Sequence, residues 1–227
     1  MEILYEDNHL LVVHKPAGMP SQDDKTGDLS VFQWAKGYIK ETYQKPGNVY
    51  VALPHRLDRP TAGVLLLAKT SKAGSRISTQ FQNRSIQKTY LAITEKVPLT
   101  PKGELNHYLS KLPGKNIMKA YAKERKDSKR AMLTYEMICS HEKQGFLKIN
   151  PTTGRKHQIR VQLASIGCVI KGDIKYGTTP FNADKSICLL AYKLSIIHPT
   201  LKEPMTFTTS LPEGSIWAPF NSMKLPL

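Results

Sequence analysis

The feature of this sequence that most constrains its fold is a short turn followed by an uninterrupted apolar run. The turn, residues 55–63, reads His-Arg-Leu-Asp-Arg-Pro-Thr-Ala-Gly, and the apolar run 64–68 follows at once. A short apolar run entered through a bend that contains Pro and Gly is typical of a buried strand. Asp58 is therefore expected at the mouth of a core strand, where a rigid scaffold can orient its carboxylate.

Two interpretations of Asp58 follow from its neighbours. The positive charges of Arg56 and Arg59 would keep the carboxylate ionised, which covalent catalysis by an aspartate requires. Alternatively, Asp58 caps backbone amides in the turn and pairs with a neighbouring arginine, since structural ion pairs are common. From the turn alone, the structural interpretation is the more ordinary one.

The charge balance indicates the kind of partner. The chain has 227 residues, of which 33 are Lys or Arg and 18 are Asp or Glu, a formal net charge of +15. This excess favours a polyanion, with RNA or DNA ahead of a membrane surface. There is no apolar stretch of membrane-spanning length and no hydrophobic leader at the start. Three widely spaced cysteines fit buried thiols in a reducing compartment. We expect a monomer in the cytoplasm that does not bind membranes.

The apolar periodicity predicts a single domain, residues 1–227, in which strands outnumber helices. Helices are expected to begin after Ser30, after Thr70 or Ser71, and after Thr152 or Thr153, the last of them ending near Gly167. The segments with strand-like patterns are a hairpin over 2–14 and single strands over 64–68, 86–93, 131–138, 145–149, 189–197 and 205–209.

Residues 110–130 are unusually basic. Eight of these 21 positions are Lys or Arg: Lys111, Lys115, Lys119, Lys123, Arg125, Lys126, Lys129 and Arg130. One interpretation is a solvated, mobile loop. The other is an arm that lies along a phosphate backbone, and the charge of the whole chain favours it.

A metal site is not expected. His55, Asp58 and His157 could in principle hold a cation, but Arg or Lys flanks each of them and would repel it. The nucleotide-binding, zinc-protease and serine-hydrolase motifs are missing. We expect neither a metal nor a cofactor.

Several motifs in a fixed order resemble the RluA family of RNA pseudouridine synthases. The segments that carry the resemblance are 5–7, 12–18, 55–63, Lys88-Thr89-Tyr90, 154–160, 170–173, 176–177 and 198–199. The likeness extends from residue 3 to about residue 212, almost the whole chain. It implies an α+β fold, a pseudouridine synthase catalytic domain with a mixed, mostly antiparallel curved sheet, flanking helices and an RNA-binding cleft.

The resemblance also implies an activity and its catalytic residues. Uridine in tRNA or ribosomal RNA would be isomerised without a cofactor, after the target base leaves the RNA stack. The family's nucleophilic aspartate falls on Asp58, its active-site tyrosine on Tyr90, and the arginine that pairs with the aspartate on Arg160.

The resemblance further implies RNA contacts. Arg56 matches the residue that fills the vacated stack, and His55, Arg155 and His157 are expected near the flipped nucleotide. Arg155 could equally be a surface charge at a helix start. In the basic segment, Lys119, Lys123 and Arg125 are expected to bind RNA. Target choice would rest on the loops of the catalytic domain, 110–130 among them, because the sequence is expected to begin on the first motif without an S4-type domain.

The sequence departs from the family pattern at four positions, His14, Ala62, Lys156 and Gln162, none of which removes a catalytic group. Two alternatives stay open: a basic RNA-binding protein whose activity has lapsed, and a hydrolase of nucleosides or glycosides that uses two carboxylates. For the hydrolase, Asp173 is the only candidate for the second acid.

Overall fold

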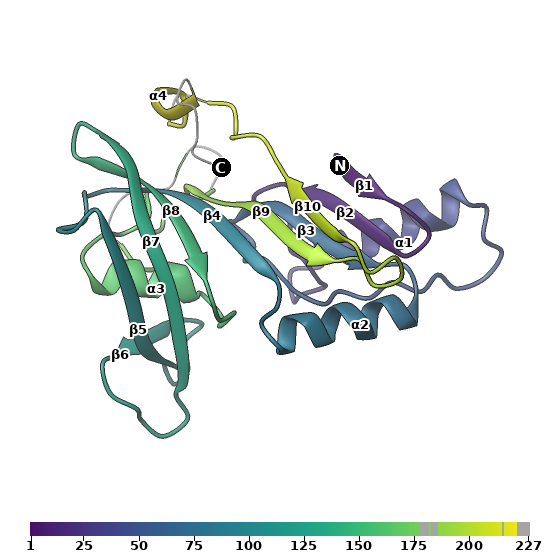
Figure 1. Ribbon diagram of the computed structural model, residues 1–227, viewed down its shortest axis with the longest axis horizontal. Coiled ribbons are helices and arrows are strands. Elements are labelled where there is room, and N and C mark those ends of the chain that lie inside the picture. Colours follow the sequence, from purple (N-terminus) through teal and green to yellow (C-terminus); the bar gives the residue numbers. More distant parts are fainter. Residues whose placement is uncertain (178–181, 183–185, 215, 222–227) are drawn as a thin grey trace. The chain divides into compact units, whose positions relative to one another are not determined.

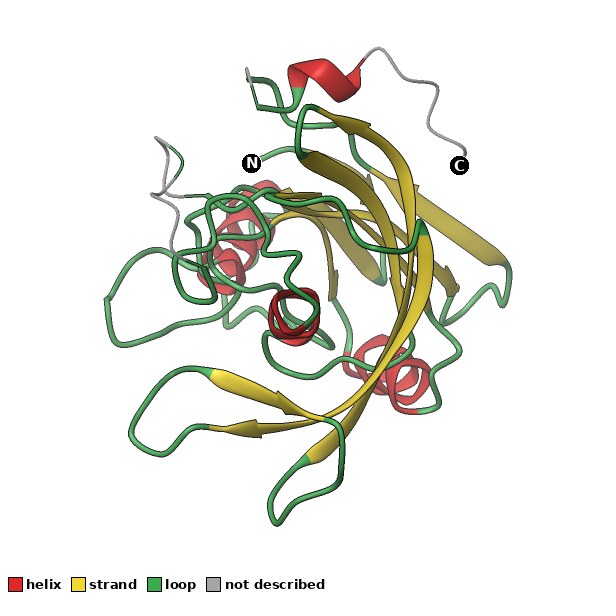
Figure 2. Cartoon of the chain, turned by 90° about the vertical axis from the view of Figure 1, so that its left-hand side faces the viewer, coloured by secondary structure: helices red, strands yellow, loops and turns green. Residues whose placement is uncertain are grey.

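The computed structural model describes residues 1–177, 182, 186–214 and 216–221. It forms two compact units, one of residues 1–87 with 191–209 and the other of residues 88–190 with 210–227. Strands predominate over helices in the fold (Figures 1 and 2). Within the described residues, no helix is long and apolar enough to cross a membrane.

The first unit contains five strands and two helices. The strands are β1 (Ile3–Glu6), β2 (Leu10–Lys15), β3 (Ala62–Ala68), most of β9 (Leu189–Ile197) and β10 (Pro204–Thr208). Their order is β1-β2-β3-β9, and β10 pairs with β9. The pairs β1–β2, β2–β3 and β9–β10 are antiparallel. The predicted hairpin at the start of the chain and the buried strand after the Asp58 turn are both confirmed.

Both helices of the first unit begin at the predicted caps. Helix α1 (Val31–Thr42) follows Ser30, whose hydroxyl accepts the Gln33 N–H. Helix α2 (Ser71–Gln82) follows Thr70, whose hydroxyl accepts the Ala73 N–H. Each cap satisfies a backbone donor that would otherwise lack a partner in the first helical turn.

The core of the first unit lies on both faces of its central strands. Leu10, Val12 and Leu66 on one face belong to the same apolar cluster as Ile77 of α2. Leu11 and Leu65 alternate with these residues, so they point to the other face, and they are equally buried. A strand buried on both faces provides a rigid base for the turn that precedes it.

Gly63 sets the approach of β3 to its neighbour. Its φ is +121°, and a Cβ at this position would overlap the backbone of Ala191 in β9. Only glycine fits such a close contact between two backbones. The Asp58 turn therefore ends at a fixed point.

The described part of the second unit contains five further strands and the short helices α3 (Gln158–Ser165) and α4 (Ala218–Asn221). The strands follow the order β4 (Gln87–Thr94), β8 (Gln144–Pro151), β7 (Lys129–His141), β5 (Lys102–Lys111) and β6 (Met118–Tyr121). All four neighbouring pairs are antiparallel. The predicted α+β class with a mostly antiparallel sheet is confirmed.

Two predictions about the second unit were wrong. The basic segment 110–130 is not all loop, because it contains β6 and the ends of β5 and β7. Strand β5 was not anticipated, since its buried positions Leu105 and Leu109 are four residues apart, a spacing that fits one face of a strand and one face of a helix equally.

The start of α3 also differs from the prediction. The helix begins at Gln158, not after Thr152 or Thr153, and its first cap is His157 in a left-handed conformation with φ of +52°. The side-chain oxygen of Gln158 accepts hydrogen bonds from the Arg155 N–H and from the Thr153 hydroxyl. Residues 152–157 therefore form an anchored turn ahead of the helix.

Candidate active site

The backbone around Asp58 is fixed by a buried serine of the first unit. The Ser21 hydroxyl donates to the Leu57 carbonyl at 2.9 Å and accepts the Leu57 N–H at 3.1 Å. On the other side, the Thr61 N–H donates to the Asp58 carbonyl at 3.0 Å. With both flanks held, the direction of the Asp58 side chain is set by the turn.

A buried lysine in the segment 12–18 connects that segment to the Asp58 turn by hydrogen bonds. The Lys15 ammonium donates to the carbonyls of Pro16, Met19 and Arg59 at 2.8, 2.7 and 3.1 Å, which engages all three of its N–H groups. Burial lowers the pKa of Lys15 to about 7, and the negative charge of Asp58 opposes this shift. The fold therefore places a buried amine within electrostatic reach of the Asp58 carboxylate.

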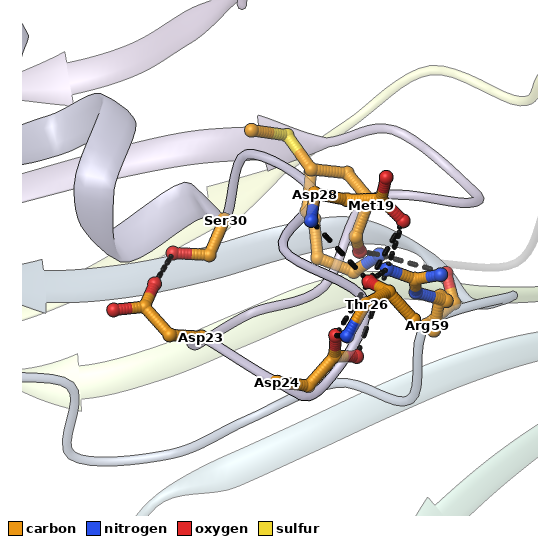
Figure 3. A network of polar contacts seen from close by, with 8 residues as sticks. Met19, Asp23, Asp24, Thr26, Asp28, Ser30 and Arg59 are labelled. Carbon is orange, nitrogen blue, oxygen red and sulfur yellow. Dashed lines mark hydrogen bonds and ion pairs between the residues drawn. The ribbon is translucent and has the colours of Figure 1, made fainter.

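The two arginines that flank Asp58 have partners in the segment before α1. Arg56 is exposed and donates to the Gln22 side chain at 2.9 Å. Figure 3 shows the Arg59 guanidinium among Asp24, Thr26 and Asp28, with its closest contact to the Asp28 carboxylate at 2.6 Å. Hydrogen bonds from Thr26 and Arg59 lower the pKa of Asp28.

His55 has a clear structural contact in the first unit. Its Nε2 accepts the Leu66 N–H at 3.0 Å, and its ring stacks on Phe81 with the centroids 4.7 Å apart. Because Nε2 is the acceptor, a neutral His55 carries its proton on Nδ1. The predicted RNA contact of His55 stays a prediction.

Tyr90 lies in the second unit, on β4 opposite Ile149 of β8. It is partly buried, and Ala92 on the same face is fully buried. Tyr90 thus stands where β4 enters the core, with Lys88 two residues before it on the same face.

Arg160 lies on α3 and forms a two-point ion pair that the sequence did not suggest. Its Nε and one terminal nitrogen each lie 2.7 Å from a carboxylate oxygen of Asp173. The two residues are 4% and 1% exposed. Asp173 is the only acid between Glu142 and Asp184, and an arginine among core residues requires a carboxylate partner. That reasoning could have predicted the pair.

The same ion pair bears on the hydrolase alternative. Both carboxylate oxygens of Asp173 bind Arg160 in a buried setting, so Asp173 is poorly placed to act as a second acid or base. The two-carboxylate mechanism therefore loses its only candidate partner.

Tyr176 joins Arg160 to His157. The Arg160 guanidinium lies 5.3 Å from the Tyr176 ring centroid, and the Tyr176 hydroxyl is 2.7 Å from Nδ1 of His157. The hydroxyl also accepts the Met118 N–H at 2.9 Å. His157 is 7% exposed, so its main surroundings are this polar network. Its RNA contact is untested.

The other basic residues predicted to bind RNA also lie in the second unit. Arg155 is partly exposed and donates from Nε to the Arg130 carbonyl at 3.0 Å. Lys119 and Arg125 both face the Tyr121 ring, at 5.5 and 4.4 Å from its centroid. Lys123 is exposed beside them. Among the described residues, no group of His, Cys, Asp and Glu side chains could hold a metal ion.

Comparison with known proteins identifies the family. The model of the RNA pseudouridylate synthase family matches residues 9–165, and the chain belongs to this family. It is 32% identical to tRNA pseudouridine synthase C of Salmonella typhi over 234 residues, covering 94% of this chain and 86% of that enzyme. Membership supports isomerisation of uridine in RNA, and the relatives are isomerases of that kind.

Two further relatives differ in how much of their length is matched. Ribosomal large subunit pseudouridine synthase C of Rickettsia bellii is 34% identical over 77% of this chain, and the chain spans 56% of that enzyme. The solved structure of human RNA pseudouridylate synthase domain containing 4 superposes with a TM-score of 0.76 at 26% identity, covering 93% of this chain and 89% of that one. The fold is therefore that of a pseudouridylate synthase domain.

Proposed function

We propose that this chain converts a specific uridine in tRNA or ribosomal RNA into pseudouridine, with Asp58 as the nucleophile. The observation that carries the proposal is the fixed turn around Asp58, held by Ser21 on one side and Thr61 on the other. Covalent catalysis needs an aimed carboxylate, and a turn with both flanks anchored provides one.

The chemistry is an isomerisation, so no atom is gained or lost overall. The bond between uracil N1 and ribose C1′ breaks, the base turns, and a bond forms between C5 and C1′. The C5 hydrogen leaves as a proton and N1 acquires one from solvent. Asp58 would attack either the ribose or the pyrimidine ring, and no cofactor is needed for either route.

The other residues act on the base and the RNA. Tyr90 stacks on the target uracil and assists removal of the C5 proton. Arg160 is the arginine that the family resemblance pairs with the nucleophilic aspartate, and a guanidinium orients a carboxylate through charged hydrogen bonds. Arg56 is exposed and fills the space that the flipped base leaves in the stack.

Release of tritium from RNA labelled at uridine C5 tests the proposal directly. Wild type should release tritium to water from a tRNA or a ribosomal RNA pool, and Asp58→Asn should lose release by at least about a thousandfold, because the amide cannot act as the nucleophile. RNA affinity should stay within a few fold.

Glu41→Gln is the matched control, since Glu41 is an exposed acid of α1. It should release tritium at the wild-type rate. Tight RNA binding by wild type without release from either pool would contradict the proposal and favour a lapsed enzyme.

A further inference from the structure

Lys88 belongs to the Lys88-Thr89-Tyr90 segment that carries part of the family resemblance. The proposed mechanism assigns this lysine no role. It lies on β4, two residues before Tyr90 and on the same face of the strand. The side chain is partly buried. Within the residues that the structure describes, its ammonium donates one hydrogen bond, to the Thr153 carbonyl at 3.2 Å. An ammonium has three N–H groups, so this contact uses a third of its capacity.

The acceptor of that hydrogen bond is rigidly placed. The Thr153 hydroxyl accepts the Met132 N–H at 2.9 Å and bonds the Gln158 side chain at 2.7 Å. Thr153 is itself buried. The Lys88 ammonium is therefore held beside a fixed carbonyl.

The surroundings of the ammonium are open on one side. The next residue, Gly154, is exposed and has no side chain, and a Cβ placed there would lie 3.7 Å from the Lys88 nitrogen. A ligand atom can approach across a glycine more closely than across any other residue.

The charge of Lys88 is not balanced by a protein carboxylate in the part of the chain that the structure describes. Burial alone lowers its pKa, to about 8. In the turn 152–157, which contains the Thr153 acceptor, the first charged residue after Thr153 is another cation, Arg155. A cation kept partly out of water without an anion is costly, and an anionic ligand would offset that cost.

We propose that the Lys88 ammonium binds a phosphate of the RNA backbone next to the target uridine and so positions that uridine on Tyr90. This inference rests on the proposed function. RNA is the anion in question, and a phosphodiester oxygen can accept both of the N–H groups that Thr153 leaves available. The contact is to the backbone and does not depend on the base.

The test is the salt dependence of RNA binding by wild type, Lys88→Met and Lys88→Arg. Each phosphate contact contributes a slope of roughly 0.7–0.9 in a plot of log affinity against log salt. Lys88→Met should lower the slope by about one unit and weaken binding at low salt by about tenfold. Lys88→Arg retains the charge and should keep the wild-type slope.

Lys143→Met is the matched control, because Lys143 is an exposed lysine on the turn between β7 and β8. It should keep the wild-type slope although it removes the same charge. Lys88→Met with an unchanged slope would overturn the proposal, as would Lys88→Arg with a slope as low as that of Lys88→Met. If Lys88→Met does not fold, Lys88→Gln, which also removes the charge but keeps a polar side chain, takes its place, and an unchanged slope in Lys88→Gln overturns the proposal.

Tritium release separates this proposal from the proposed function. If wild type binds RNA but releases no tritium, the proposed function fails, and the binding slopes measured with bulk tRNA still decide whether Lys88 contacts phosphate. If wild type is active and Lys88→Met alters only the rate at saturating RNA, the phosphate contact fails while the function stands.

Discussion

Lys15 and Lys88 are two lysines removed from water, one in each unit, and the fold treats them differently. Burial lowers the pKa of both, to about 7 and about 8. Among the described residues, Lys15 donates to three backbone carbonyls of its own unit, whereas Lys88 donates to one. The number of acceptors thus distinguishes a lysine that holds the fold together from one that is available to a ligand.

The buried pair of Arg160 and Asp173 sharpens this comparison, because here the cation has a full carboxylate partner. Asp173→Asn keeps the shape of the side chain but leaves the arginine charge without its anion. The free energy of unfolding should fall by about 3 kcal/mol, since breaking a buried ion pair leaves an uncompensated charge. Urea unfolding followed by circular dichroism measures it.

The exposed pair of Lys102 and Glu136 provides the control. Its charged atoms are also 2.7 Å apart, but the side chains are 72% and 45% exposed. Glu136→Gln should change the free energy of unfolding by less than about 1 kcal/mol. Equal losses of unfolding free energy in Asp173→Asn and Glu136→Gln would show that burial does not determine how much an ion pair contributes to stability.

Replacing Lys15 tests the structural side of the comparison. Lys15→Met leaves three carbonyls without their donor and should lower the free energy of unfolding by about 2 kcal/mol. The turn before β3 loses the hydrogen bond from Lys15 to the Arg59 carbonyl, so tritium release should slow. The salt slope of RNA binding should stay that of wild type. Lys88→Met, by contrast, should lower the salt slope of RNA binding.

Lys72→Met is the control for Lys15, because Lys72 is exposed on α2. It should match wild type in stability, release and slope. A lowered salt slope in Lys15→Met would show that Lys15 also binds RNA, and the distinction drawn from the number of acceptors would fail.

The sequence predicted the first unit better than the second. In the first unit, Ser30 and Thr70 cap their helices as predicted, and the run after Asp58 is a buried strand. These features are local, since a cap or a turn depends on residues a few positions apart. Local signals survive in the folded chain wherever tertiary contacts do not compete with them.

The second unit depends on contacts between residues distant in the sequence, which local patterns do not encode. Thr153 resembles a helix cap, but its hydroxyl bonds Met132 and Gln158, so the helix starts later. The pairing of Arg160 with Asp173 spans 13 residues. The resemblance named Tyr90 and Arg160 without these partners, and it left Lys88 without a role.

A pH titration of RNA binding should give the smallest effect and the finest test of Lys88. With a pKa of about 8, Lys88 is charged at pH 7 and roughly one-tenth charged at pH 9. The charged form binds phosphate, so affinity should fall as pH rises through 8, by several fold. Bound phosphate favours the ammonium, so the fall should be shallower than tenfold per pH unit.

Lys88→Arg isolates this effect, because a guanidinium stays charged throughout the range. Among the described residues, the hydrogen-bond partner of the ammonium is the Thr153 carbonyl. Tyr90 lies on the same face of β4, and Arg155 follows Gly154 in the sequence. Among them, the Thr153 carbonyl does not titrate, and the arginine keeps its charge. The RNA affinity of Lys88→Arg should therefore fall less between pH 7 and pH 9 than that of wild type. A fall with pH as large as that of wild type would assign the titration to another group and place Lys88, like Lys15, among the lysines that serve the fold.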